Sequence, residues 1–547
     1  MKFKLSKFWL LLLIVAVAAI LRFWQLGRVP PSPDWDEAAL GYNAYSIMKT
    51  GKDEYGQFLP LILRSFDDYK PAIYTYFIIP GIKIFGLNVF AVRLPAAILG
   101  VLAVVMVYFL VIELTDNQAL ALAASLMLAI SPWHLQFSRI AFESNIGVLF
   151  NILWVYVFLK SLKKPLLLPV AAFLAGVNLY VYQAEKIFTP LLVLAVTFIF
   201  RKEIVKIKRR FLISGLIVGF VSLVPFIYMV KTTPEIFLRA KGTSLTADQT
   251  PFLARTVEKV ARDYQQKNYL GLILDNRRIT YLIAAISGYL THFDLNWLFL
   301  TGDEARHHAP GMGLLYLWEL PFLIIGVYEL VFSQKINKKT KLVIFAWFLI
   351  APIPASFTSG VPHAVRTLRF LPMMQILVAL GILKSWQIIS QKKNFIKIPL
   401  VLFASALMIF NFAYYLNQYF VQQNYFNSAS WQYGYEPAIA EIQKIENNYQ
   451  KIIVSNQPYL DQSYMFFLFY LKFNPVEYQR LGGTQSGGFA EAHRGFSKYT
   501  FRPIKWEEEE KKGTLFVGRP ADFPSGAKVL KTINFLNHRP AILLVEG

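Results

Sequence analysis

A series of apolar runs, separated by short polar connections, fills most of the first 420 residues. A helix needs roughly 20 apolar residues to cross the hydrocarbon core of a bilayer, and about eleven runs are close to that length. They lie near residues 8–24, 94–114, 119–133, 144–160, 165–182, 187–200, 211–230, 312–332, 342–358, 368–387 and 396–416. Of all residues, 55% are hydrophobic and only 16% are charged. The pattern therefore predicts a polytopic α-helical membrane protein, because helices satisfy their own backbone hydrogen bonds in lipid.

The basic residues predict how the chain is oriented. The net charge of +22 could suggest a nucleic-acid partner, but Lys and Arg stand in short clusters between the apolar runs. With a cytoplasmic N-terminus, the cytoplasmic connections are basic at 160–164, 201–210, 335–341 and 392–397, and nearly chargeless only at 115–118. This agrees with the positive-inside rule. We predict a multi-pass protein of the cytoplasmic membrane that contacts membrane lipids and no nucleic acid.

Other features narrow the function. The chain contains no cysteine, which excludes disulfides, thiolate nucleophiles and cysteine-ligated metals. Its N-terminal run lacks a small-residue cleavage site, so we expect an uncleaved signal anchor.

Two segments on the predicted outer face are long enough to hold structure. The first outer loop, residues 25–93, includes the run 71–85, which is short, carries Lys83 and is interrupted by Pro80. We expect an interfacial or re-entrant helix there. The long outer loop, residues 231–311, should contain helices of its own, including an amphipathic helix over 279–299 in the outer interface.

The character of the sequence changes after Asn417, where polar residues become more frequent. Alternation and periodicity predict helices and strands in this part. The helices are expected at 436–449 and 461–471, and the strands at 451–456, 514–520 and 541–547. We therefore divide the chain into a transmembrane domain, 1–417, and a small extracytoplasmic α/β domain, 418–547.

Ionisable residues other than cytoplasmic Lys and Arg gather on the predicted outer face. They are Asp34, Asp36, Glu37, Asp67, Asp68, Lys70, Arg139, Glu143, Glu185, Lys186, Asp303, Glu304, Arg306, His307, His308, His363, Arg366 and Arg369. A charge at membrane depth costs about 2.5–3.5 kcal/mol on insertion scales, so such residues are expected to pair or to function. A transporter would instead place polar residues midway through broken helices. The one-sided distribution favours a site at the outer membrane surface.

The location restricts the chemistry of that site. Nucleotide sugars are cytoplasmic, so a transferase that faces outward must take its donor from a lipid. Inverting transfer from a lipid phosphate needs one general base and cationic groups for the phosphate, whereas a glycosidase needs two carboxylates. The stretch PPSPDWDEAALGY, residues 30–42, supplies carboxylates directly after the first apolar run.

Several motifs carry a family resemblance over roughly residues 1–420. They are DWDEAALGYNA, DDYKPAIYTYF, GLNVFAVRLPAAILG, SRIAFESN, LYVYQAEKIFTP, GDEARHHAPGMGLLYLWELP and PHAVRTLRFLP. In this order the chain resembles the GT-C membrane glycosyltransferases. The similar group is the family 39-like one, related to protein O-mannosyltransferases and the lipid A aminoarabinose transferase. The resemblance implies a GT-C fold and a polyprenyl-phosphate sugar donor, with a glycan, lipid or protein hydroxyl as the acceptor.

The resemblance also implies roles for single residues. The aspartate of the family's DE pair is the catalytic base, which corresponds to Asp36, with Asp34 as the lesser candidate. Glu37 is expected to start the helix or to support the site. The lysine of the family's KP element contacts the lipid phosphate, which corresponds to Lys70. Lys186 stands where many relatives have arginine.

Further outer-face residues are candidates with open alternatives. Arg139 and Arg366 are candidate phosphate ligands. Alternatively, Arg139 could pair with Glu143, and Arg366 and Arg369 could anchor lipid headgroups. Lys70 could instead form an ion pair with Asp67 or Asp68. Glu143 stands where relatives have an acidic residue.

The histidines leave the cofactor open. Asp303, His307 and His308 suggest either a metal or a loop that orders over substrate. No metal ligand is assigned, and a divalent metal remains an option.

Three other functions also remain open. They are a lipid or glycan transporter, an oligosaccharide ligase with a lipid-diphosphate donor, and a non-catalytic scaffold.

Overall fold

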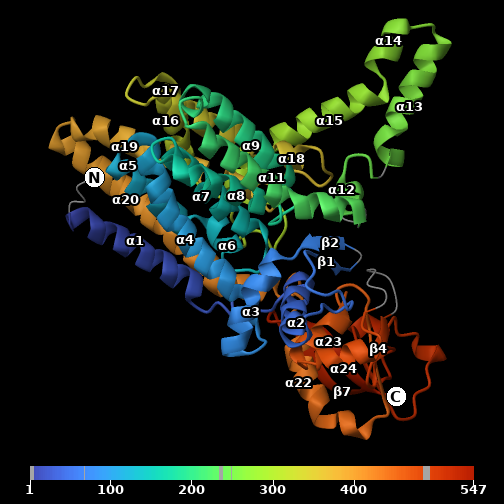
Figure 1. The fold of residues 1–547 in the computed structure, drawn as a ribbon. Coiled ribbons are helices and arrows are strands. Elements are labelled where there is room, and N and C mark those ends of the chain that lie inside the picture. The colour runs from blue at the N-terminus through green and yellow to red at the C-terminus, as the bar shows by residue number, and fades with distance from the viewer. Residues whose placement is uncertain (1–4, 67, 233–237, 248, 485–492) are drawn as a thin grey trace.

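The computed structural model describes residues 5–66, 68–232, 238–247, 249–484 and 493–547. It consists of a helical bundle and a C-terminal domain that contains a sheet (Figure 1). Each of the apolar runs corresponds to a helix. These helices are α1 (Leu5–Phe23), α4 (Val89–Thr115), α5 (Gln118–Ile130), α7 (Ser144–Ser161), α8 (Leu168–Asn178), α9 (Glu185–Ile199), α11 (Arg209–Thr232), α16 (Glu319–Phe332), α17 (Lys338–Ile350), α19 (Met373–Ser390) and α20 (Asn394–Asn417). The expected polytopic helical fold is confirmed.

By length and composition, 6 helical segments of the described chain can each cross a membrane. They are 89–115, 144–161, 209–232, 338–356, 368–390 and 394–427. Other apolar helices, such as α5 and α3 (Ile73–Phe85), are shorter. The predicted count of about eleven spans therefore stays a prediction.

Some of the apolar runs are only partly helical, among them 312–332 and 119–133. Residues 312–318 of the run 312–332 are not helical, because this segment packs closely against the π-helical turn Trp297–Thr301: the Leu314 N–H donates to the Leu298 carbonyl at 2.8 Å. At Gly313 a Cβ atom would lie 2.6 Å from that carbonyl oxygen. In the run 119–133, helix α5 ends at Ile130, and Pro132 starts the short helix α6 (Pro132–Phe137).

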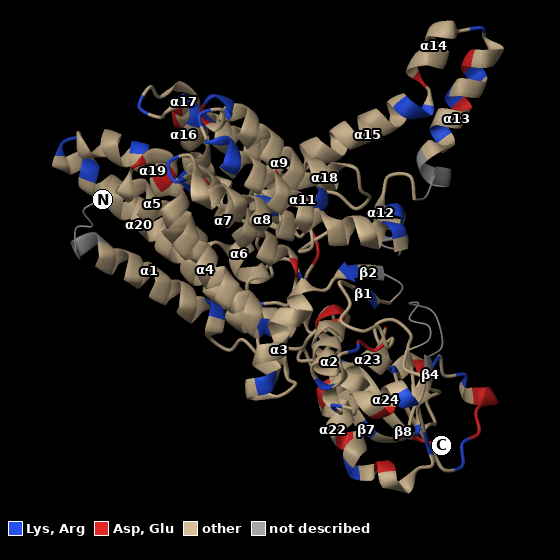
Figure 2. Cartoon of the chain, in the orientation of Figure 1, with Lys and Arg blue, Asp and Glu red and all other residues tan. Residues whose placement is uncertain are grey.

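The central helices carry few charges, and Lys and Arg concentrate near helix ends and connections (Figure 2). Three ion pairs bring predicted cytoplasmic connections together. Glu113 pairs with Lys160 at 2.6 Å and with Lys163 at 2.8 Å, and Glu203 pairs with Lys339. These contacts place the paired connections on the same side of the bundle, and which side is cytoplasmic stays a prediction.

The first outer loop folds as helix α2 (Trp35–Thr50), a hairpin of β1 (Ile62–Ser65) and β2 (Asp68–Pro71), and helix α3. In the hairpin Leu63 faces Lys70. Helix α3 packs against α2 and α4, and at Gly81 a Cβ would lie 3.0 Å from the Ala91 carbonyl oxygen. The expected helix in 71–85 is present.

The long outer loop contains helices of its own, as expected. They are α12 (Leu238–Thr243), α13 (Gln249–Gln265), α14 (Tyr269–Leu274) and α15 (Arg277–Thr291), followed by a π-helical turn (Trp297–Thr301). Helices α13 and α14 project away from the bundle (Figure 1). The expected amphipathic helix over 279–299 is interrupted, because α15 ends at Thr291.

The C-terminal domain contains a mixed sheet with the strand order β4-β5-β3-β6-β8-β7 in the described residues. Strand β3 is parallel to β5 and β6, and the remaining pairs are antiparallel. Its elements are α22 (Tyr435–Ile445), β3 (Lys451–Val454), α23 (Ser463–Tyr470), α24 (Pro475–Arg480), β4 (His493–Phe496), β5 (Tyr499–Phe501), β6 (Thr514–Gly518), β7 (Lys528–Asn534) and β8 (Pro540–Glu546). All helices and strands expected here are present. Helix α24 and strands β4, β5 and β7 were not predicted; β7 is an exposed edge strand with Lys528 and Lys531.

Candidate active site

Asp34 caps the N-terminus of α2. The prolines before it prevent the helix from beginning earlier. One carboxylate oxygen of Asp34 accepts the Glu37 N–H at 2.9 Å, and the other accepts from Nη1 of Arg306 at 2.6 Å. The side chain is fully buried, and this burial raises the pKa of Asp34 to about 6, although Arg306 favours the charged form. Both oxygens of Asp34 are thus engaged in holding the loop.

Glu37 forms a buried ion pair with Arg93 of α4. Arg93 donates from Nε to Oε1 at 2.9 Å and from Nη2 to Oε2 at 2.8 Å. The same guanidinium donates to three backbone carbonyls within residues 26–32 at 2.7–3.2 Å, and the Ala141 N–H donates to Glu37 at 2.8 Å. Glu37 thus holds the first outer loop to α4, and its supporting role in the site stays a prediction.

Asp36 forms an ion pair with Lys70 of β2. The Asp36 side chain is 21% exposed, whereas Asp34 and Glu37 are fully buried. Lys70 is 8% exposed, and its Nζ lies 5.9 Å from the centre of the Phe66 ring. Of the three acids, Asp36 is thus the one that a second molecule can reach.

Lys186 lies next to the same strand. Its Nζ donates to Gln183 Oε1 at 2.5 Å, and Gln183 Nε2 donates to the Tyr69 carbonyl at 2.9 Å. Lys186 Nζ also lies 5.4 Å from the centre of the Phe226 ring. Because Tyr69 precedes Lys70, the structure brings the two predicted lysines to one region.

An apolar groove of about 460 Å³ begins beside this region. Its walls come from the first outer loop, α8 and α11. They are formed by Leu61, Ala72, Ile73, Tyr76, Phe173, Val177, Tyr180, Ile217, Val218, Val221, Ser222 and Pro225. Ala72 lies two residues after Lys70, and Phe226 directly follows Pro225. The groove thus begins two residues from Lys70 and next to Phe226, whose ring Lys186 contacts, and its outer walls, such as Phe173 and Ile217, are exposed.

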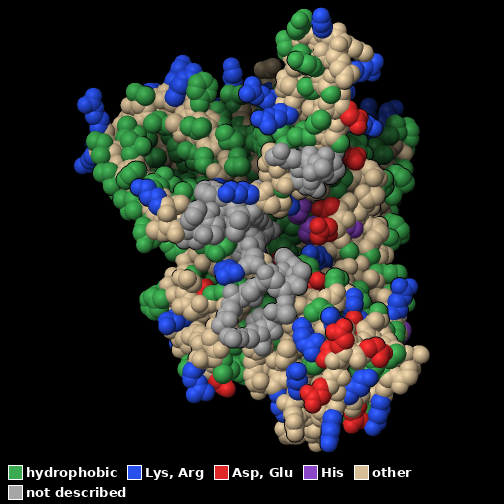
Figure 3. Space-filling model, turned by 90° about the vertical axis from the view of Figure 1, so that its right-hand side faces the viewer, with side chains coloured by type: hydrophobic (Ala, Val, Ile, Leu, Met, Phe, Trp, Pro, Cys, Tyr) green, Lys and Arg blue, Asp and Glu red, His purple; other side chains and the backbone are tan. Residues whose placement is uncertain are grey.

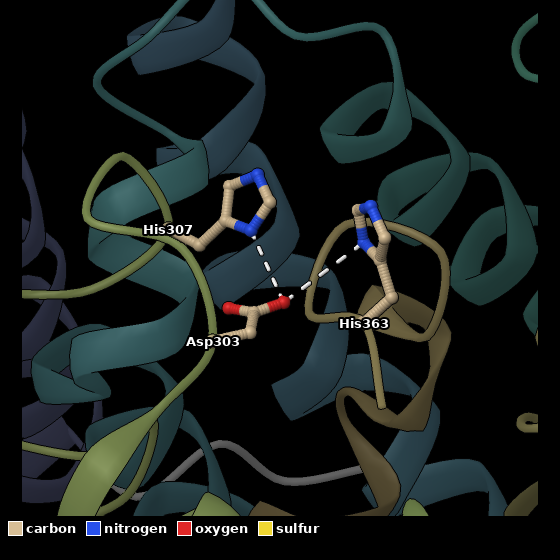
Figure 4. A group of neighbouring side chains, drawn as sticks. All are labelled: Asp303, His307 and His363. Atoms are coloured by element: carbon tan, nitrogen blue, oxygen red, sulfur yellow. Dashed lines mark ion pairs between the residues drawn. The ribbon is translucent and has the colours of Figure 1, made fainter. Parts of the chain in front are cut away.

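Asp303, His307 and His363 form a second group (Figure 4). The Nδ1 atoms of His307 and His363 lie 3.1 Å and 4.0 Å from Asp303 Oδ2. Burial opposes ionisation of Asp303, but the adjacent His307 and the Ala364 N–H lower its pKa to about 2. One potential ligand atom from each residue lies within 4.8 Å of the others. A carboxylate and two imidazoles are suitable ligands for a divalent metal such as zinc.

His308 is not part of this group. Its Nδ1 lies 2.9 Å from the Ala309 carbonyl oxygen, and its ring packs on Gly302, which has φ +62°. A Cβ at Gly302 would lie 2.3 Å from the ring. The third member of the group is therefore His363, which comes from a different segment of the chain, and not His308. Histidine and acidic side chains are visible together on one face of the molecule (Figure 3).

Arg139 and Arg366 are engaged elsewhere. Buried Arg139 donates to the carbonyls of Leu21 at 2.7 Å and Val29 at 3.0 Å, which holds the end of α1. Arg366 donates to Thr358 Oγ1 at 2.7 Å. Both side chains already donate to backbone or hydroxyl groups, and their phosphate-binding roles remain predictions.

Glu143 lies buried directly before α7. Glu185 is also buried and accepts from Arg369 Nε at 3.1 Å, so this pair lies inside the protein. The supporting role predicted for Glu143 is still a prediction.

Sequence reasoning did not assign Arg93 or Arg306 to the site. Arg93 interrupts the apolar run VFAVRLPAA, and a charge within such a run indicates a buried partner. That signal could have identified Arg93 as an anchor, although not Glu37 as its partner. His363 was recognised only as an outer-face residue.

Residues 69–229 match the family model described as dolichyl-phosphate-mannose-protein mannosyltransferase. No curated protein sequence gives a significant match. Among solved structures, ArnT from Cupriavidus metallidurans in the apo state is 14% identical, with a TM-score of 0.56 over 99% of this chain and 98% of that chain. The same protein bound to undecaprenyl phosphate gives 13% identity and a TM-score of 0.57, over 97% of both chains.

The archaeal oligosaccharyltransferase AglB from Archaeoglobus fulgidus, in complex with an inhibitory peptide and a dolichol-phosphate, is also similar. It is 10% identical over 86% of this chain, with a TM-score of 0.51, and the match spans only 63% of its length. At such identities the similarity establishes the fold. It confirms the expected fold class, a multi-pass helical membrane domain followed by a small sheet domain.

Proposed function

The chain has the GT-C fold of membrane glycosyltransferases, and we propose that it transfers a sugar from a polyprenyl-phosphate donor to an acceptor hydroxyl at the outer face of the membrane. One observation carries this proposal: the Asp36–Lys70 ion pair lies beside an apolar groove. This arrangement combines a carboxylate base, a cation for phosphate and an apolar surface for an isoprenoid chain.

The donor would bind along the groove. Its isoprenoid chain would contact the apolar side chains of α8 and α11, and its phosphate would accept from Lys70 and Lys186. Charge-assisted hydrogen bonds to a phosphate are stronger than neutral ones. Two structures of this fold were solved with a polyprenyl phosphate, undecaprenyl phosphate in ArnT and dolichol-phosphate in AglB, which supports this donor class.

The transfer would then be a single displacement. The acceptor oxygen attacks the anomeric carbon while Asp36 takes the hydroxyl proton, and the bond from that carbon to the phosphate oxygen breaks. The phosphate leaves with the bonding electrons as an anion, which Lys70 and Lys186 stabilise. No general acid is needed, and the anomeric centre is inverted.

Replacement of Asp36 by asparagine tests the proposal. General base catalysis contributes typically 10²–10⁴ in rate, so Asp36→Asn should lower kcat by about that factor. Donor binding should persist, because Lys70 and Lys186 remain. The control is Asp294→Asn, at an exposed acid of the long outer loop, which should retain normal turnover. Near-normal transfer by Asp36→Asn would refute the assignment.

We also propose that a divalent cation binds Asp303, His307 and His363. Elemental analysis of purified protein should find near-stoichiometric metal, and Asp303→Asn should lose most of it. Equal metal content in both proteins would refute the site. Such a cation also suits the ligase alternative, because a lipid diphosphate carries more negative charge. EDTA-sensitive transfer of a whole oligosaccharide from a lipid diphosphate would select that alternative.

A further inference from the structure

Helix α2, which carries Asp36, is held by the C-terminal domain as well as by the bundle. It packs against α23 and α24 on one side and against α3 and α4 on the other (Figure 1). At Gly41 a Cβ would lie 2.7 Å from the Phe469 ring and 2.7 Å from Val92. The Tyr42 hydroxyl donates to the Phe473 carbonyl at 3.2 Å. Any shift of the C-terminal domain would therefore reach α2.

Gln432 contacts the residue that directly precedes the proposed base. Its Oε1 accepts the backbone N–H of Trp35 at 3.0 Å. Trp35 stands between Asp34 and Asp36, and its N–H belongs to the first turn of α2, where backbone donors have no helical partner. The Nε2 of Gln432 donates to the carbonyls of Asp461 at 3.1 Å and Tyr459 at 3.3 Å. One side chain thus links the start of α2 to the segment that follows β3.

The backbone of Gln432 is strained. Its φ angle is +48°, in the left-handed region that residues other than glycine and asparagine rarely adopt. The residue is buried, and each polar atom of its amide has a partner. Such conformations persist where the surrounding structure demands them, and they cluster at functional sites.

We propose that Gln432 is a positioning residue that fixes the first turn of α2, and with it the carboxylate of Asp36, against the C-terminal domain. This inference rests on the proposed function, in which Asp36 is the base. Gln432 acts through the Trp35 backbone and is not itself catalytic. The C-terminal domain thereby becomes part of the catalytic apparatus.

Gln479 provides a matched control. It belongs to α24 of the same domain, and its Nε2 donates to Thr50 Oγ1 at 3.0 Å and Ser46 Oγ at 3.1 Å, at the opposite end of α2. Gln432→Met removes the interdomain hydrogen bond to Trp35, and Gln479→Met removes those to Thr50 and Ser46, in both cases without a large change in volume. Only the first change lies beside Asp36.

The kinetic test compares kcat and donor KM in the two variants. Misplacement of a reacting group by about 1 Å can cost about 10²-fold in rate. Gln432→Met should therefore lower kcat at least tenfold with little change in KM, while Gln479→Met should stay within twofold of the wild type. Gln432→Asn should behave like Gln432→Met, because asparagine tolerates the left-handed backbone but is too short to reach Trp35. Normal kcat in either Gln432 variant would overturn the proposal.

Hydrogen exchange gives a readout that does not depend on turnover. Peptides covering residues 34–40 should exchange faster in Gln432→Met than in the wild type, and Gln479→Met should leave them unchanged. Equal exchange in both variants would overturn the positioning role. A wild-type protein without transferase activity would instead refute the proposed function, and the exchange comparison would still decide whether Gln432 fixes α2.

Discussion

Replacement of Lys70 by methionine should weaken donor binding strongly. Lys70 is almost buried and would offer the donor phosphate a charge-assisted hydrogen bond beside the apolar groove. A hydrogen bond to a charged group contributes about 1.5–3 kcal/mol net, and 1.4 kcal/mol corresponds to a factor of ten. Lys70→Met should thus raise the donor Kd by about 10- to 150-fold. Methionine retains most of the apolar stem, so the hairpin of β1 and β2 should stay folded.

Because Lys70 is paired with Asp36, a second substitution at Asp36 should partly restore donor binding. In Lys70→Met the carboxylate of Asp36 has lost its cation and repels the phosphate. The double variant Asp36→Asn/Lys70→Met should therefore bind the donor more tightly than Lys70→Met alone, although it lacks the base and should transfer more slowly. Non-additivity of this kind is expected for side chains in contact.

Equilibrium binding of a polyprenyl-phosphate donor to protein in detergent measures these changes. Lys83→Met, at an exposed lysine of α3 in the same loop, is the control and should bind normally. A Kd for Lys70→Met within twofold of the wild type would refute the phosphate-binding role. Equal affinity of the single and double variants would refute the electrostatic coupling.

Two further changes test the packing around the site. Glu37→Gln leaves buried Arg93 without a full countercharge, which should cost about 3–5 kcal/mol of stability and lower Tm. The control is Glu304→Gln, at a side chain that is 57% exposed, and it should change Tm little. Glu54 is fully buried and accepts from Thr484 Oγ1 at 2.7 Å, and burial raises its pKa from 4.5 to about 7. The Glu54 carboxyl therefore binds its proton more tightly in the folded state than in the unfolded state. The free energy of unfolding should fall by about 3 kcal/mol as the pH rises from 4.5 to 7. Glu54→Gln should flatten this dependence, and equal slopes of Tm against pH in both proteins would contradict the assignment.

Local sequence patterns predicted the helices well because each apolar run has its own length and flanking charges. The segment 312–318 shows where this reasoning fails. It is apolar, but it is not helical where Gly313 approaches the Leu298 carbonyl. Hydrophobicity reports burial, whereas this backbone path depends on segments that are distant in the chain.

The same distinction applies to the site. The capping role of Asp34 has a local signature, since an N-cap aspartate is followed by Glu37 at the third helical position. The partners of Glu37 and Asp34 have no local signature in the sequence. Arg93 lies 56 residues after Glu37, and Arg306 lies 272 residues after Asp34. The ranking of Asp36 over its neighbours came from family resemblance, and its greater exposure became visible only in the structure.

The two members of the Asp36–Lys70 pair are held by different side chains. Lys70 belongs to a hairpin that Gln183 ties to the segment between α8 and α9, whereas the helix of Asp36 is tied to the C-terminal domain by Gln432. The turn of the hairpin also contacts this domain, because the Phe66 ring packs against Tyr464 of α23. Exchange of the C-terminal domain between related chains should therefore change the rate of transfer and, through Phe66, donor binding as well, so chimeras should be assayed for both.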